Sequence, residues 1–109
     1  MAKNITITFE NKEYRLEFSR RTVEQLERQG FSIADIDRKP MTALPMLFAG
    51  AFLKNHRNVK KDLIDKIYEE IPNKTDFLGK LAEMYNEPLE TLMEEPEGSE
   101  GKAQWVTSW

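Results

Sequence analysis

The sequence contains no cysteine and only one histidine, His56. The absence of cysteine excludes a disulfide framework, a thiolate metal site and a thiol nucleophile. A single imidazole argues against a histidine-based zinc site. We therefore expect neither a metal nor another cofactor.

The chain also lacks a hydrophobic run long enough to cross a bilayer, which takes about 20 apolar residues. Its first residues, MAKNITITFENK, carry charge at once and have no apolar core of the kind found in signal peptides. These absences predict a cytoplasmic protein that does not bind a membrane.

Catalytic motifs are missing as well: there is no Gly-rich phosphate loop and no serine-nucleophile elbow. His56 could act as a general base, but no candidate nucleophile lies near it in the sequence. The cations around it fit either a nucleic-acid patch or the negative end of a helix dipole; they are Lys54, Arg57, Lys60 and Lys61. Because the chain is acidic overall and has no nucleic-acid motif, we expect neither enzymatic activity nor nucleic-acid binding.

Charge is unevenly distributed along the 109 residues, whose net charge is −3. Residues 1–61 carry 12 Lys and Arg against 7 Asp and Glu, whereas residues 62–109 carry 4 against 12. Such polarity could serve head-to-tail self-association in a homo-oligomer, or a partner of opposite charge. It could equally reflect two halves of one fold that attract each other.

The most apolar segment is TALPMLFAGAFLKNH, residues 42–56. It is apolar on every side when wound as a helix, so we predict a central core helix that its neighbours cover on several sides. Thr42 is the expected N-cap, and Pro45 would fall in the first turn. A waist of small residues, which would let a neighbour approach closely, consists of Ala49, Gly50 and Ala51.

Residues 4–18 alternate between apolar and polar side chains, which is typical of a β-hairpin. The apolar positions are Ile5, Ile7, Phe9, Tyr14, Leu16 and Phe18. A two-residue turn at Asn11 and Lys12 would place all six on one face, with Phe9 opposite Tyr14. That apolar face would need helices to cover it.

Helical periodicity predicts further helices at about residues 20–29, 59–71 and 75–94. The first would open at Ser19 or at Thr22, because Thr22 with Gln25 fits a capping box. It would end with Gly30 at the C′ position, and Phe31 would fold back onto it.

The remaining boundaries follow from local signals. Ser32 to Asp37 predicts one short helical turn, with Ile33 and Ile36 directed inward. Asn58 is the expected cap of the third helix, and Asn73 or Thr75 that of the last. The apolar stripe of the last helix keeps its phase across Pro88, so this helix either bends there or stops near Asn86 and restarts.

Together these patterns predict an α+β fold with an N-terminal antiparallel β-hairpin followed by a compact bundle of about four helices. We expect a single domain over residues 1–95 and a flexible C-terminal tail over residues 96–109.

Three sets of side chains are candidate sites. Asp62, Asp65 and Glu69 share a helix face and could hold a cation, although a solvated face is the preferred explanation. Glu83, Glu87, Glu90 and Glu94 form an acidic stripe that is either the solvated side of the helix, as most such stripes are, or a surface that attracts a basic protein. In the tail, Trp105, Val106 and Trp109 could anchor a partner or dock on their own domain.

Four stretches carry a resemblance that covers essentially the whole chain: ITITFENKEYRLEFSRRTVEQLERQGF, PMLFAGAFLKNHRNVKK, LGKLAEMYNEPLETLMEEPE and QWVTSW. They resemble a family of small phage and prophage proteins of Gram-positive bacteria, which is listed as a domain of unknown function. Its members are often called tail assembly chaperones of long-tailed phages.

The resemblance implies a non-enzymatic protein in the bacterial cytoplasm that binds the tape measure protein, a long and mostly helical polypeptide, or the tail tube protein. It supplies no catalytic residues. Two other classes stay open: a structural tail completion subunit that remains in the virion, and a prophage-encoded regulator that binds a host protein.

Overall fold

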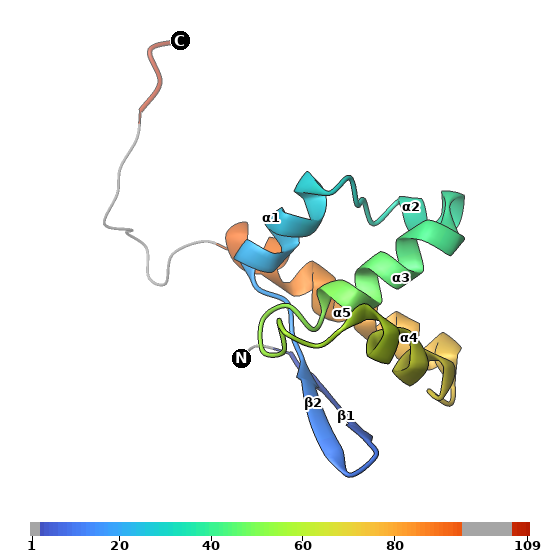
Figure 1. Cartoon of the computed structure of the whole chain (residues 1–109). Coiled ribbons are helices and arrows are strands. Elements are labelled where there is room, and N and C mark those ends of the chain that lie inside the picture. Colours follow the sequence, from blue (N-terminus) through green and yellow to red (C-terminus); the bar gives the residue numbers. More distant parts are fainter. Residues whose placement is uncertain (1–2, 95–105) are drawn as a thin grey trace.

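We describe residues 3–94 and 106–109 from a computed structural model of the chain. Within these residues an antiparallel hairpin of two strands is followed by five helices (Figure 1), so the predicted α+β class is confirmed. The elements are β1 (Ile5–Phe9), β2 (Lys12–Leu16), α1 (Arg20–Arg28), α2 (Asp35–Arg38), α3 (Pro40–Gly50), α4 (Lys61–Glu69) and α5 (Lys74–Leu92).

The hairpin register differs by two residues from the prediction. Ile5 lies opposite Leu16 and Phe9 lies opposite Lys12, so the predicted Phe9–Tyr14 pair and the turn at Asn11 and Lys12 are wrong. The turn is formed by Glu10 and Asn11, both with positive φ. A shift of two residues leaves every side chain on the same face, and the apolar pattern therefore cannot distinguish the two registers.

Strand pairing ends at Leu16, so the residues that follow β2 can bind the helices instead of the other strand. The N–H of Glu17 donates to the carbonyl oxygen of Ala51 at 3.1 Å, just beyond the end of α3. The next residue, Phe18, is buried in the core. The hairpin is thus joined to the helices at its β2 end, and its turn extends away from them (Figure 1).

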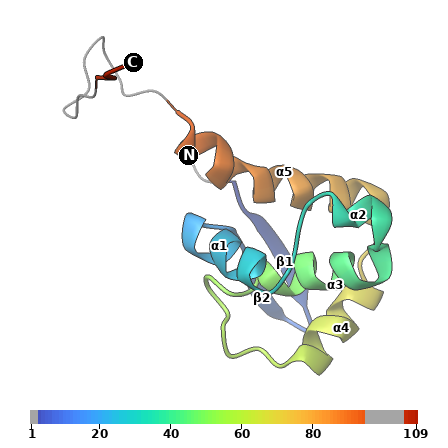
Figure 2. The ribbon, with the colours of Figure 1, turned by 90° about the horizontal axis from the view of Figure 1, so that it is seen from above.

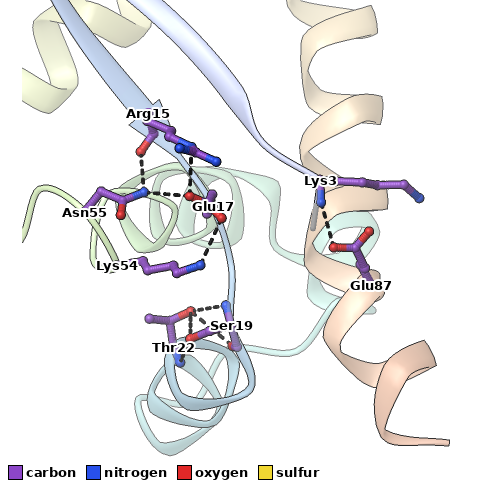
Figure 3. Close-up of polar contacts among 8 residues, drawn as sticks. All are labelled: Lys3, Arg15, Glu17, Ser19, Thr22, Lys54, Asn55 and Glu87. Atoms are coloured by element: carbon purple, nitrogen blue, oxygen red, sulfur yellow. Dashed lines mark hydrogen bonds and ion pairs between the residues drawn. The ribbon is translucent and has the colours of Figure 1, made fainter. Parts of the chain in front are cut away.

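α1 begins at the first of the two predicted caps. Ser19 is the N-cap, and its side chain and that of Thr22 form a capping box (Figure 3), so the alternative pairing of Thr22 with Gln25 is wrong. The end of α1 confirms the prediction: Gly30 has a φ of 94°, and the N–H of Phe31 donates to the carbonyl of Leu26 at 3.0 Å.

α3 is shorter than the predicted helix and begins earlier. Pro40 occupies its first turn, where a missing N–H costs nothing, and Thr42 therefore lies inside the helix rather than at its cap. Pro45 falls beyond the first turn. After Gly50 the chain continues in hydrogen-bonded turns, and the N–H of His56 donates to the carbonyl of Phe52 at 2.7 Å.

The core forms around α3, as the sequence predicts. Buried side chains come from every element except β1 and α2, and the bulkiest fully buried ones are Phe48, Phe52, Leu16, Leu26, Leu47, Ile67, Leu81 and Met84. Coverage of α3 is incomplete, however, because Met41 is 90% exposed and Pro45 is also exposed. The expectation of cover on several sides therefore holds for the second half of the helix only.

The other predicted helix boundaries are confirmed only in part. The N-cap of α4 is Lys60, not Asn58, and the predicted span of residues 59–71 narrows to Lys61–Glu69. Asn73 is the N-cap of α5, but with a φ of 50° it makes no side-chain cap bond. Ile36 is half-buried against the core, whereas Ile33 is exposed, because α2 begins only at Asp35.

α5 passes through Pro88 without interruption, so the alternative of a stop near Asn86 is wrong. Its 19 residues run along the other helices (Figure 2), and α1, with 9 residues, packs against its second half. Among the described residues, no helix is both long and apolar enough to cross a membrane.

Candidate protein-binding groove

An open groove of about 450 Å³ lies between α1 and the second half of α5. Its α1 side is lined by Arg20, Val23, Glu24 and Glu27. Its α5 side is lined by Tyr85, Asn86, Pro88, Leu89 and Leu92. The segment Phe31–Ile33, which follows α1, completes the lining. We call this surface the α1–α5 groove.

The floor of the α1–α5 groove is supported by a buried aromatic cluster. Tyr85 packs edge-on against Phe18 and against Phe31, with ring centroids 5.2 Å apart in both pairs. All three side chains are buried. Burial raises the pKa of the Tyr85 hydroxyl above its ordinary value, and the negative charge of Glu27 adds to this effect. The raised pKa keeps the Tyr85 hydroxyl uncharged, so the bottom of the groove combines an apolar ring with a neutral polar group.

The walls of the groove are apolar and open to solvent. Leu89 and Leu92 are each 56% exposed, and Ile33 is 38% exposed. Leu89 and Leu92 continue the apolar stripe of α5 beyond the part of the helix that the core covers. Met93, one residue past the end of α5, is 73% exposed and extends the same apolar surface. Contiguous exposed side chains of this size are typical of a binding surface rather than of a solvated helix.

Charge is confined to the rim. Arg20, Glu24 and Glu27 come from α1, and Glu24 pairs with Arg28 one turn further along that helix. The groove therefore has one charged edge, on α1, and an uncharged side on α5; apolar grooves of this kind are a known way to bind the apolar face of an amphipathic helix. Within residues 3–94 and 106–109, no three Asp, Glu or His side chains are grouped so that they could hold a metal ion.

The sequence predicted these residues only in part. Leu89 and Leu92 lie on the apolar stripe that the sequence predicts to continue across Pro88. What the sequence did not reveal is that α1 covers too little of α5 to bury them. The sequence feature that could have indicated this is the length of the stripe, which is longer than any helix predicted to pack on it.

The predicted acidic residues lie on the opposite face of α5 from Leu81 and Leu92, given 3.6 residues per turn. Glu87 is half-buried and accepts a hydrogen bond from the N–H of Lys3 at 2.7 Å (Figure 3). Glu83 lies 3.9 Å from Lys80. Glu90 and Glu94 are exposed. These four side chains do not line the α1–α5 groove.

The predicted tail anchors are only partly described. Val106 is 93% exposed and Trp109 is 98% exposed. Trp105 lies outside the described residues, as does most of the segment predicted as a flexible tail. The role of these anchors stays a prediction.

Of the remaining candidate residues, His56 makes contacts that hold the fold together, and the three carboxylates of α4 are exposed. His56 uses Nε2 to accept a hydrogen bond from the N–H of Arg15 at 2.8 Å, and it stacks edge-on against Tyr14. One ring nitrogen is therefore already engaged in holding the hairpin. Asp62, Asp65 and Glu69 are all exposed on α4.

Comparison with known proteins gives one result. The sequence model of a family described as a domain of unknown function, DUF5055, matches residues 1–109. No curated protein sequence and no solved structure shows a significant match.

Proposed function

The chain belongs to the DUF5055 family, and we propose that it acts as a non-enzymatic tail assembly chaperone that binds the tape measure protein of a long-tailed phage in the α1–α5 groove. The tail tube protein is a further partner in this proposal. The proposal rests on the resemblance of the sequence to tail assembly chaperones and on the open apolar groove.

The groove is the single observation that carries the proposal. A tape measure protein is a long helical polypeptide with apolar stripes that aggregate when they are uncovered. Leu89, Leu92 and Ile33 present the apolar surface that such a stripe requires, and α1 adds charged side chains along one edge of it. Binding by one helix face would need no chemistry beyond burial of apolar area.

The test is co-expression with the tape measure protein from the same genome, followed by affinity capture of this chain. We expect soluble tape measure protein only when the chain is present. The variant Leu92→Glu places a charge in the groove wall and should reduce the captured amount at least about tenfold, the equivalent of about 1.4 kcal/mol. Because Leu92 is 56% exposed, the free energy of unfolding should change by less than about 1 kcal/mol.

Met41→Glu is the matched control, because Met41 is an exposed apolar residue of α3 outside the groove. This variant should capture the tape measure protein as the unsubstituted chain does. Loss of capture with Met41→Glu but not with Leu92→Glu would place binding on α3 and contradict the groove. A tape measure protein that stays insoluble in every co-expression would contradict the chaperone function itself.

A further inference from the structure

A second pocket, of about 470 Å³, lies between β2, the loop that follows α3 and the start of α4. Its charged lining residues are all cations: Lys12, Arg57 and Lys60. Apolar area is supplied by Tyr14, Val59 and Leu63. We call it the basic pocket.

The cations of the basic pocket have no carboxylate partner within the described part of the chain. Their neighbours do: Arg15 and Lys54 both pair with Glu17, and Lys66 pairs with Glu10. Lys12 instead has its ammonium 5.6 Å from the centroid of the Tyr14 ring. Three positive charges around one concave surface create a potential that attracts an acidic ligand.

The acidic face of α5 has the opposite surplus. Glu83, Glu87 and Glu90 follow one side of the helix over about 11 Å, at 1.5 Å per residue, and Glu94 lies two residues past the end of the helix. Glu90 and Glu94 pair with no cation in the described residues. Among the residues that the structure describes, no ion pair joins this face to the basic pocket, so Glu90, Glu94 and the pocket cations remain available to another molecule.

We propose that the acidic face of α5 in one copy of the chain docks into the basic pocket of a second copy, head to tail. The occupant is favoured by charge complementarity, since each copy carries both surfaces. In the part of the chain that the structure describes, Glu90, Glu94 and the three pocket cations pair with no opposite charge.

Such a contact joins the acidic face of one copy to the basic pocket of another. Each pair of copies therefore still has one unoccupied acidic face and one unoccupied basic pocket. Head-to-tail contacts of this kind produce rings or open chains of copies. Because the acidic face lies opposite the α1–α5 groove on the same helix, the groove of each copy would stay open. The inference goes beyond the proposed function and does not depend on it.

The experiment is sedimentation velocity of the full chain across a concentration series at two ionic strengths. At about 10 mM ionic strength, where the Debye length is about 30 Å, the average mass should rise with concentration to at least twice that of one chain. In about 1 M salt, where the Debye length is about 3 Å, it should return to one chain.

Charge reversal provides the decisive comparison. The pocket variant Arg57→Glu/Lys60→Glu and the helix variant Glu90→Lys/Glu94→Lys should each remain single chains at low salt. Mixed together, they should associate again, because each reversed surface then meets a surface of opposite sign. The control Asp65→Lys/Glu69→Lys changes the same charge on the exposed face of α4 and should associate as the unsubstituted chain does. All substituted residues are exposed, and circular dichroism of each variant verifies that it folds.

Three results would overturn the proposal. One is a single-chain mass at low salt over the whole concentration series. Another is a mixture of the two reversed variants that stays unassociated. The third is association that the pocket variant abolishes and the helix variant does not, since the pocket would then bind an acidic surface of the second copy other than that of α5.

Discussion

Gly50 of α3 and Leu26 of α1 lie so close together that a methyl group added to Gly50 would be 2.6 Å from Cδ1 of Leu26. Leu26 is 2% exposed, and its side chain would have to shift to admit the methyl group. The close approach confirms the small-residue waist predicted for this helix. It also explains how α1 can pack directly against the central helix.

The variant Gly50→Ala should therefore lower the free energy of unfolding by about 1–2 kcal/mol. Overpacking of a core costs about 1–3 kcal/mol, and the better helix propensity of alanine returns up to about 1 kcal/mol. Urea unfolding measures the change. Gly79→Ala is the matched control: a Cβ at Gly79 meets no atom within 4 Å in α5, so this variant should gain up to about 1 kcal/mol. Equal effects of the two substitutions would disprove the steric explanation.

Glu17 should make stability depend on pH. Hydrogen bonds from Lys54 at 2.9 Å and from Asn55 at 3.0 Å hold the pKa of this buried carboxyl below its ordinary value of 4.5 (Figure 3). A lowered pKa in the folded state means that the stabilisation is complete above the ordinary pKa. It is lost as the pH falls through the folded-state pKa.

Glu17→Gln should consequently reduce the free energy of unfolding near neutral pH by about 1–3 kcal/mol, the usual effect of losing hydrogen bonds to a charged group. The difference from the unsubstituted chain should shrink as the solution is acidified below about pH 4.5. Thermal unfolding at a series of pH values checks this. A difference that stays constant down to the lowest pH would show that the charge of Glu17 contributes nothing.

The hairpin turn should accept a stabilising replacement. Glu10 and Asn11 have φ values of 50° and 64°, and a glutamate in this conformation is strained. The double variant Glu10→Asn/Asn11→Gly supplies the residues that a two-residue hairpin turn prefers. It should gain about 1 kcal/mol, even though it removes the exposed pair of Glu10 with Lys66, 3.7 Å apart, which contributes little. A loss of stability would indicate that the turn has the register originally predicted from the sequence.

The fold could be predicted from the sequence wherever a local rule decides the structure. The end of α1 is an example, since only glycine readily takes the φ of Gly30 and an apolar residue follows it. The hairpin shows the limit. Alternation fixes which face each side chain occupies, but it does not fix which residues are opposite one another.

The candidate site could be predicted less well, because it depends on what is not covered. Leu89 and Leu92 have the same spacing and character as buried members of the stripe, such as Leu81. The difference arises from the short length of α1 and from the position at which Gly30 ends it. How much of one helix another helix covers cannot be predicted from the periodicity along a single helix.

Pro88 removes one backbone hydrogen bond from the part of α5 that lines the α1–α5 groove. Proline has no N–H, so α5 lacks the backbone hydrogen bond that would otherwise reach the carbonyl of Met84. The turn that carries Leu89 and Leu92 is therefore tied to the rest of the helix by one bond fewer than its neighbours. A small rotation at this point would widen or narrow the groove without disturbing the aromatic floor, so helices with apolar side chains of different bulk could be accepted by one and the same surface.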